Sequence, residues 1–190
     1  AAPKTPGRTR EVFGKAWHNP SGKFGFILLT LLILAAVLAP WISPADPTKQ
    51  VLTDTDVAPM WLGGEGGCIL GTDSLGRDVL SRVLHGLRLS LFIGIVAATL
   101  AACLGLVLGV LAGWYESTLG KLLMRLADIQ FAVPFVAVGI ALTAVLGPGL
   151  TPVLLILSVW GWTTYARTIS NSVAQVKRAD FVTAARTMGV

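Results

Sequence analysis

Few side chains in this 190-residue sequence are of the types that carry out catalysis or bind metals. An apolar stretch that we expect to cross a membrane separates the two histidines, His18 and His85, so they assemble neither a Ser/His/Asp group nor a metal site. Cys68 stands in a glycine-rich loop and Cys103 inside an apolar stretch, so we expect no disulfide. No Gly-x-x-x-x-Gly-Lys-Ser/Thr phosphate loop occurs. We therefore expect no catalytic residue, metal or cofactor in this chain.

A second group of side chains that could take part in binding is the charged set Arg77, Asp78 and Arg82. Apolar residues recur at helical spacing after Thr72 and Asp73, two good helix caps, which predicts an amphipathic helix. Asp73 with Arg77, and Asp78 with Arg82, stand four residues apart, a spacing at which ion pairs support a helix. A solvated helix surface is the simplest interpretation, and an outer vestibule lined by Arg77, Asp78 and Arg82 is the alternative.

The elements that must position these residues are strongly apolar. Hydrophobic residues make up 54% of the chain and charged residues 13%, with a mean hydropathy of +0.72, outside the usual balance of soluble globular proteins. Three stretches, 24–43, 89–115 and 129–166, contain no charged residue, and the last is too long for one crossing of about 20 residues. We therefore predict an all-α integral membrane protein with four membrane-spanning helices, at 24–43, 89–115, 121–146 and 151–170, the last two separated by Gly147-Pro148-Gly149.

The distribution of basic residues predicts how these helices are oriented. The tail 1–23 carries five basic residues and one acid, whereas the segment 44–88 carries six acids and four bases. By the positive-inside rule both chain ends are cytoplasmic and 44–88 is external, which puts 11 of the 15 Lys and Arg residues inside. Because the bases flank apolar spans instead of forming a stripe on a polar domain, the net charge of +5 indicates a membrane protein and no nucleic-acid partner.

Small residues recur every three or four positions along the second predicted span. In lipid such a face lets two helices approach closely, so we expect it to pack against another helix, with pore lining as the alternative. The glycines of this predicted packing face are Gly94, Gly105, Gly109 and Gly113.

Two residues stand out at the start of the third predicted span. Pro134 lacks a backbone N–H and is expected to kink the helix. Asp128 follows Arg125 by three residues, so we expect a local ion pair, with a functional role at the membrane boundary as the alternative. The next charged residue is Arg167, so the predicted spans offer no carboxylate relay for coupling to an ion gradient.

Three stretches together resemble a known family. The segment Leu70-Gly71-Thr72-Asp73, followed by Gly76-Arg77-Asp78, resembles the signature that leads into the core permease domain of the dipeptide, oligopeptide and nickel importers, in their "C"-type permease. Gly147-Pro148-Gly149-Leu150 and Tyr165-Ala166-Arg167 are similar to the same family's pattern around the third and fourth spans. Residues 179–189 resemble the start of the EAA loop of ABC import permeases, with Thr183 where the family usually has an acid.

The resemblance implies a type I ABC importer permease fold with four of six transmembrane helices present, residues 89–190 forming part of the permease domain. We therefore expect a truncated subunit that stops inside an EAA coupling loop begun at 174–190. In such a subunit Ala184, Ala185 and Gly189 contact a cytoplasmic ATPase, which binds ATP and magnesium. The implied partners are that ATPase, a second permease subunit and an extracytoplasmic solute-binding protein, at the plasma membrane of a bacterium.

The predicted function is therefore a non-enzymatic subunit that forms half of the transmembrane pathway of an ATP-driven importer of dipeptides, oligopeptides or related solutes. An ion-coupled secondary transporter and a membrane scaffold without transport activity are the alternatives. The sequence does not identify the solute, because importers of dipeptides, oligopeptides, glutathione and nickel resemble one another in these motifs.

Overall fold

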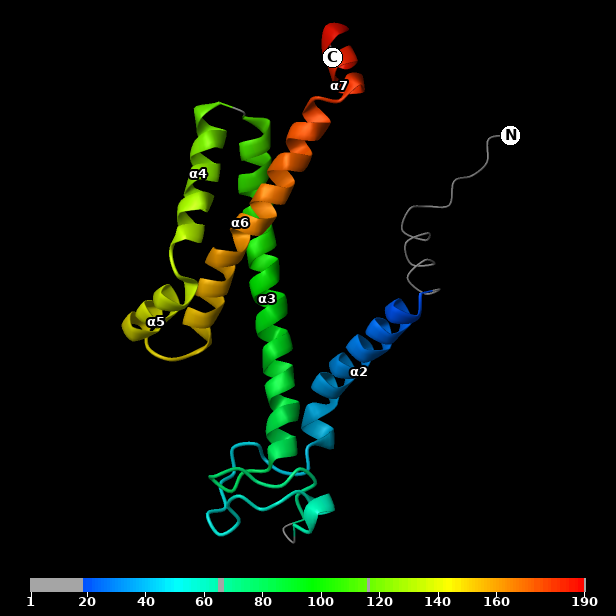
Figure 1. The fold of residues 1–190 in the computed structure, drawn as a ribbon, viewed down its shortest axis with the longest axis vertical. Helices are drawn as coiled ribbons and strands as arrows, with labels where there is room; N and C mark the ends of the chain where they lie inside the picture. Colours follow the sequence, from blue (N-terminus) through cyan, green and yellow to red (C-terminus); the bar gives the residue numbers. More distant parts are fainter. Residues whose placement is uncertain (1–18, 65–66, 116, 190) are drawn as a thin grey trace, which may run out of the picture. The chain divides into compact units, whose positions relative to one another are not determined.

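The computed structural model describes residues 19–64, 67–115 and 117–189, and Figure 1 shows the order of the helices along the chain. The described residues contain helices and one isolated bridge between Thr72 and Asp78, which confirms the predicted all-α class. Most of the predicted basic tail 1–23, together with His18, lies outside the described range. The helices are α2 (Pro20–Ile42), the short 3-10 helix η1 (Met60–Leu62), α3 (Val79–Trp114), α4 (Thr118–Ala132), α5 (Phe135–Leu146), α6 (Leu150–Lys177) and α7 (Asp180–Thr187).

Two helices of the described chain, α2 and α3, are long and apolar enough to span a membrane. The bent pair α4 and α5 adds a third span if it is counted as one. The 28-residue helix α6 falls outside this group because its second half, from Thr163 onward, is rich in polar residues. The protein is thus an integral membrane protein, and the four crossings remain a prediction.

The first of the two compact units of the chain comprises residues 1–91. Helix α2 begins at Pro20, four residues earlier than predicted, because Asn19 caps it: the Asn19 Oδ1 accepts a hydrogen bond from the Ser21 amide at 3.2 Å. Proline at the first helical position also fits, since its missing N–H would have no partner there.

The amphipathic helix predicted to begin at Thr72 instead begins at Val79, so this part of the prediction is wrong. Residues 72–78 fold back on the loop: the Asp73 amide donates to the Arg77 carbonyl at 3.0 Å, and Gly76 has a φ of +70°. A Cβ built on Gly76 would lie 1.8 Å from the Val51 carbonyl oxygen. This turn requires glycine and a positive φ, so the helical spacing of the apolar residues cannot extend through it.

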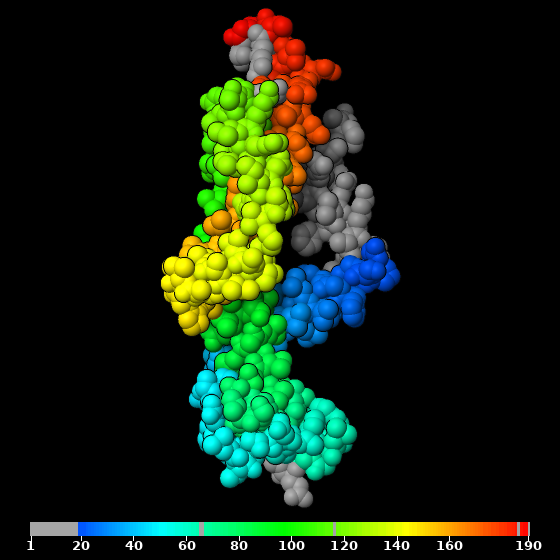
Figure 2. Space-filling model, turned by 60° about the vertical axis from the view of Figure 1, so that its left-hand side comes forward, coloured from blue at the N-terminus to red at the C-terminus, as the bar shows by residue number. Residues whose placement is uncertain are grey.

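Helix α3 then continues for 36 residues, about 54 Å, as one element through the predicted span 89–115. The following predicted helix, 121–146, is interrupted: α4 and α5 meet at an angle of 86°. Val133 is extended, with ψ 130°, since the residue before a proline is excluded from the helical region. Pro134 therefore breaks the helix completely, where a kink was predicted, and Figure 2 shows α5 projecting sideways from the end of α4.

The second unit, residues 92–190, is built on close contact between α3 and α6. A Cβ on Gly109 would lie 2.6 Å from the Ala166 carbonyl oxygen, and one on Gly113 would lie 2.6 Å from the Ser170 carbonyl oxygen. A Cβ built on Gly105 would approach α6 as closely. Gly94 differs, because a Cβ there would have no atom within 4 Å. Three of the four glycines predicted for packing thus lie against the backbone of α6.

Helix α4 completes this packing by lying against both α3 and α6. Ala127 of α4 and Ala166 of α6 are fully buried, and with Trp162 they form the apolar core of the unit, against which Leu108 and Met124 pack. In Figure 1, α6 crosses the upper part of α3 while α4 runs beside it. The core therefore sits where α3, α4 and α6 meet.

The glycine contacts predict a position-dependent effect of adding one methyl group. Gly109→Ala should lower the unfolding free energy of the complete protein by about 1–3 kcal/mol, because α3 and α6 must separate to admit the new Cβ. Gly94→Ala serves as the matched control and should leave stability unchanged or higher, since alanine favours helix and meets no neighbour. Thermal unfolding in detergent measures both, and equal melting temperatures would contradict the close contact.

Candidate functional site

One candidate site is a cluster of charges where the loop 43–78 meets the first turn of α3. The Arg77 Nε donates to the Asp73 Oδ2 at 2.8 Å, and the Arg82 Nη1 donates to the same oxygen. Two guanidinium groups thus share one carboxylate, which leaves one net positive charge. The Arg82 side chain is 44% exposed and that of Asp73 only 16%, so the positive groups face outward.

Asp78 was predicted to pair with Arg82, and the structure contradicts this pairing; its burial also does not fit the alternative in which Asp78 lines a vestibule. Asp78 is 4% exposed, and its Oδ2 accepts hydrogen bonds from the Ser81 amide, at 2.7 Å, and from the Ser81 hydroxyl. The Ser81 Oγ in turn accepts from the Ala45 amide at 3.1 Å. Asp78 therefore caps the start of α3 and ties the loop to it.

The hydrogen bonds of Asp73 also affect its ionisation. The backbone amide of Arg77 donates to the carboxylate at 3.0 Å, and this contact, with those of the Leu75 amide and the Arg77 side chain, lowers the pKa of Asp73 to about 2. The carboxylate is therefore fully charged wherever the loop is folded at neutral or mildly acid pH. Nearby, burial raises the pKa of the Cys68 thiol, and the negative charge of Asp78 adds to the effect.

In the second unit, polar side chains connect α4 to α6. The Trp162 Nε1 donates to the Gln130 Oε1 at 3.0 Å, and the Gln130 Nε2 donates to the Val159 carbonyl oxygen at 2.7 Å. Gln130 stands just before the Pro134 break, so it fixes the last turn of α4 against α6. The sequence analysis missed Gln130, because an isolated glutamine carries no spacing signal.

An ion pair that the sequence analysis also missed lies five residues after Trp162 on α6. The Arg167 Nη2 donates to the Asp128 Oδ1 at 2.7 Å, and the Arg167 guanidinium carbon lies 5.1 Å from the centre of the Phe131 ring. The expected local pair with Arg125 is therefore wrong: Asp128 pairs across to α6. Both side chains are about half exposed, at 48% for Arg167 and 56% for Asp128.

The predicted coupling residues lie at the end of the described chain. Ala184 and Ala185 belong to α7, which follows α6 after a short break, and Gly189 comes just after α7 with a φ of +83°. Ala184 and Gly189 are exposed and Ala185 is half-buried. Phe181 of α7 and Met188, the residue after it, are 70% and 76% exposed. The segment thus presents an uncovered surface of small and large apolar residues.

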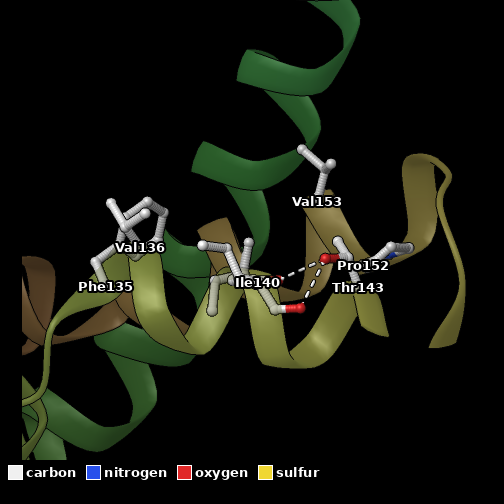
Figure 3. A pocket seen from close by; sticks show the side chains of 8 residues that line it. Phe135, Val136, Ile140, Thr143, Pro152 and Val153 are labelled. Atoms are coloured by element: carbon white, nitrogen blue, oxygen red, sulfur yellow. Dashed lines mark hydrogen bonds between the residues drawn. The ribbon is translucent and has the colours of Figure 1, made fainter. Parts of the chain in front are cut away.

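A shallow apolar groove of about 310 Å³ runs between α5 and α6 (Figure 3). Phe135, Val136 and Ile140 line it from α5, with Pro152 and Val153 opposite on α6. The one hydroxyl of the lining, that of Thr143, donates within its own helix to the carbonyls of residues 139 and 140. The groove therefore offers apolar contact area and no group for chemistry.

The lowered pKa of Asp73 predicts that the loop loses stability in acid. The charged form is favoured in the folded state, so its contribution is present above the usual aspartate pKa of 3.8 and disappears as the pH falls toward 2. Asp73→Asn should flatten the fall in melting temperature between pH 5 and pH 2.5 that the unchanged protein shows. Asp56→Asn, which removes a loop carboxylate outside any ion pair of the described residues, should keep that fall. Identical pH profiles for the two variants would contradict the assignment.

Comparison with known proteins bears on both units. The family model described as the binding-protein-dependent transport system inner membrane component matches residues 105–190, and the model of the N-terminal TM domain of oligopeptide transport permease C matches residues 8–59. The first match covers the α3–α6 contact, the α4–α6 contacts and α7. The second covers α2 and the start of the loop.

Curated relatives match nearly the whole chain. The di/tripeptide transport system permease protein DppC of Pseudomonas aeruginosa is 37% identical over 97% of this chain and 61% of its own length. The dipeptide transport system permease protein DppC of Haemophilus influenzae is 34% identical over 99% of the chain and 63% of its own length, and the oligopeptide transport system permease protein OppC of Bacillus subtilis is 34% identical over 90% and 54%. The chain thus spans about three-fifths of the length of these relatives. The resemblance in the motifs is confirmed: over nearly its whole length the chain is similar to permeases of binding-protein-dependent transport systems.

Proposed function

We propose that this chain is part of the permease subunit of an ATP-driven importer of dipeptides or short oligopeptides. The observation that carries the proposal is 37% identity across 97% of the chain to a relative named as a di/tripeptide permease. In such a subunit the helices of this chain form part of one half of the pathway, and a second, homologous permease forms the other half. ATP and magnesium bind to separate cytoplasmic subunits, and this chain performs no hydrolysis.

The segment that would receive the motion from the ATPase is α7 with its flanking residues. Ala184 and Ala185 are small enough to let another protein approach the helix backbone, and Gly189 ends the helix in a conformation that favours glycine. Phe181 and Met188 add apolar area of the kind that binds a partner. A helix held in a groove of the ATPase would move with it and tilt α6, to which α7 is joined by the two residues 178–179.

The orientation that fits this role has both chain ends in the cytoplasm of a bacterium and the loop 44–78 outside its plasma membrane. The net positive charge of Arg77 and Arg82 on their shared carboxylate would then face a solute-binding protein that delivers the peptide. Opposite charge on the docking surface of that protein would speed its association. Asp78 takes no direct part, because it is buried at the start of α3.

The test introduces one negative charge at a time into α7 of the full-length permease. Ala185→Glu should reduce both co-purification of the ATPase and ATP-driven peptide uptake by more than about tenfold, because a carboxylate would be buried without a partner. Thr183→Glu is the matched control: it adds the same charge to the same helix at an exposed position, where the family usually carries an acid, and should preserve both.

Three results would contradict the proposal. If Ala185→Glu retains ATPase binding and uptake, α7 is not the coupling contact. If uptake by the unchanged importer in vesicles ignores ATP and stops when an ionophore collapses the ion gradient, the protein is an ion-coupled transporter instead. Absence of any uptake by the complete assembly would leave only the scaffold alternative.

A further inference from the structure

Three consecutive large apolar side chains of the first unit are uncovered. Met60, Trp61 and Leu62, which form η1, are 53%, 65% and 70% exposed. Beside them Ile69, whose carbonyl oxygen accepts a hydrogen bond from the Met60 amide at 3.3 Å, is 46% exposed. Single exposed apolar side chains are ordinary, but a contiguous group of this kind marks a surface that something else covers.

The backbone around η1 holds these side chains outward. A Cβ built on Gly64 would lie 1.9 Å from the Ala58 carbonyl oxygen, and one on Gly71 would lie 2.3 Å from the Val57 carbonyl oxygen. The residues before and after η1 are therefore in direct backbone contact within the segment 57–72. This contact leaves no space between them into which the side chains of η1 could turn.

The first unit also contains a helix whose end marks the membrane surface. Helix α2 is long and apolar enough to span a membrane, and its charge-free part, residues 24–42, is about 28 Å long. All of this part is needed to cross a hydrocarbon core of roughly 30 Å, so Trp41 and Ile42 lie at its edge. Trp41 is 76% exposed, as is typical of tryptophan at the boundary between lipid and water.

A short series of contacts leads from this edge to η1. Ala45, three residues after the end of α2, donates its amide to the Ser81 Oγ at 3.1 Å. Two residues before Ser81, the Val79 amide donates to the Gly71 carbonyl oxygen at 3.1 Å. Gly71 is two residues from Ile69, the hydrogen-bond partner of η1. In both Figure 1 and Figure 2, η1 lies on the same side of the loop as α2.

The charges of the loop favour a membrane surface as the partner of η1. Apart from Glu65, the segment 57–72 contains no charged residue, whereas acids flank it at Asp56 and Asp73. Within the described chain only Ala36 and Ala39 of α2 are buried, so η1 continues an exposed apolar surface that begins on a membrane-spanning helix. Side chains such as tryptophan, with an apolar body and one polar N–H, suit the headgroup layer at that boundary.

We propose that η1 inserts into the headgroup layer of the membrane and anchors the loop there. Trp61 lies among the headgroups, while Met60 and Leu62 reach the top of the acyl chains. Amphipathic elements that bind membranes bury their apolar face about 5–10 Å into this boundary. The inference holds for either orientation of the chain and does not rest on the proposed function.

The anchor has a consequence for the rest of the loop. Because Gly71 binds the first residue of α3, an η1 fixed in the membrane keeps the start of α3 at a constant height above it. The charge cluster of Asp73, Arg77 and Arg82 stands between these two attachments. Its position relative to the membrane is therefore fixed as well.

The experiment places an environment-sensitive dye at position 62 of the complete permease in phospholipid vesicles. The background carries Cys68→Ser and Cys103→Ser, and Leu62→Cys supplies the labelled thiol. Lipids with a nitroxide near the top of the acyl chain should remove most of the emission of this dye, and aqueous iodide should remove little. Thr53→Cys is the matched control: it is an exposed position in the same loop beside Asp54, and its dye should respond in the opposite way.

Two further variants show whether the apolar side chains cause the insertion. With the dye at position 62, Trp61→Asp should restore quenching by iodide, because a carboxylate is costly at the hydrocarbon boundary. Trp61→Phe should keep the dye in lipid. Both should leave the melting temperature unchanged, since Trp61 is exposed within the chain. A lower melting temperature in Trp61→Asp with unchanged quenching would show a structural role and refute the anchor.

Two other outcomes would overturn the inference. If iodide quenches the dye at position 62 as strongly as the dye at position 53, η1 remains in water. If the dye at position 62 leaves water only after a solute-binding protein is added, the surface binds that protein and not lipid. Uptake is not measured in this experiment, so its failure leaves the proposed function untouched.

Discussion

Close contact between the backbones of α3 and α6 is the constraint on which the second unit depends. Gly105, Gly109 and Gly113 present no side chain, so α6 lies directly on the backbone of α3, and any Cβ there would overlap it. Hydrophobicity does not drive helices together in lipid, and contact of this kind supplies the van der Waals attraction instead. Once α6 is fixed on α3, α4 packs against both helices, and the small core around Trp162 closes between the three.

Contacts with α6 fix the angle at which α4 and α5 meet. Pro134 interrupts the helix, and without other contacts the two halves would hinge freely about Val133. Gln130 holds the last turn of α4 to α6 through hydrogen bonds with Trp162 and the Val159 carbonyl. On the α5 side of the break, the Phe135 ring packs edge to face on Trp160, with 5.6 Å between the ring centres. Helices α4 and α5 are thus both held against α6, so a motion of α6 would move the bend between them.

Local patterns in the sequence predicted the helices and most of the packing glycines. The predictions failed where the structure depends on contacts between residues far apart in the sequence. Apolar stretches and glycine spacing are local signals, so the helices and three of the four packing glycines could be placed. The helix start was misplaced because the turn at Gly76 depends on Val51, a residue 25 positions earlier that no periodicity reveals. Asp128 was assigned to the wrong arginine for the same reason: helical spacing favours neighbours at three or four residues, whereas Arg167 is 39 residues away.

The same long-range pairing joins α4 to α6 a second time. Asp128 stands two residues before Gln130 on α4, and its carboxylate accepts a hydrogen bond from Arg167 of α6 at 2.7 Å. The two side chains neutralise each other, so the contact adds no net charge to the pair of helices. With the Gln130 contacts it fixes the second half of α4 on α6 ahead of the break at Pro134, so the bend is positioned by contacts with a helix that comes later in the chain.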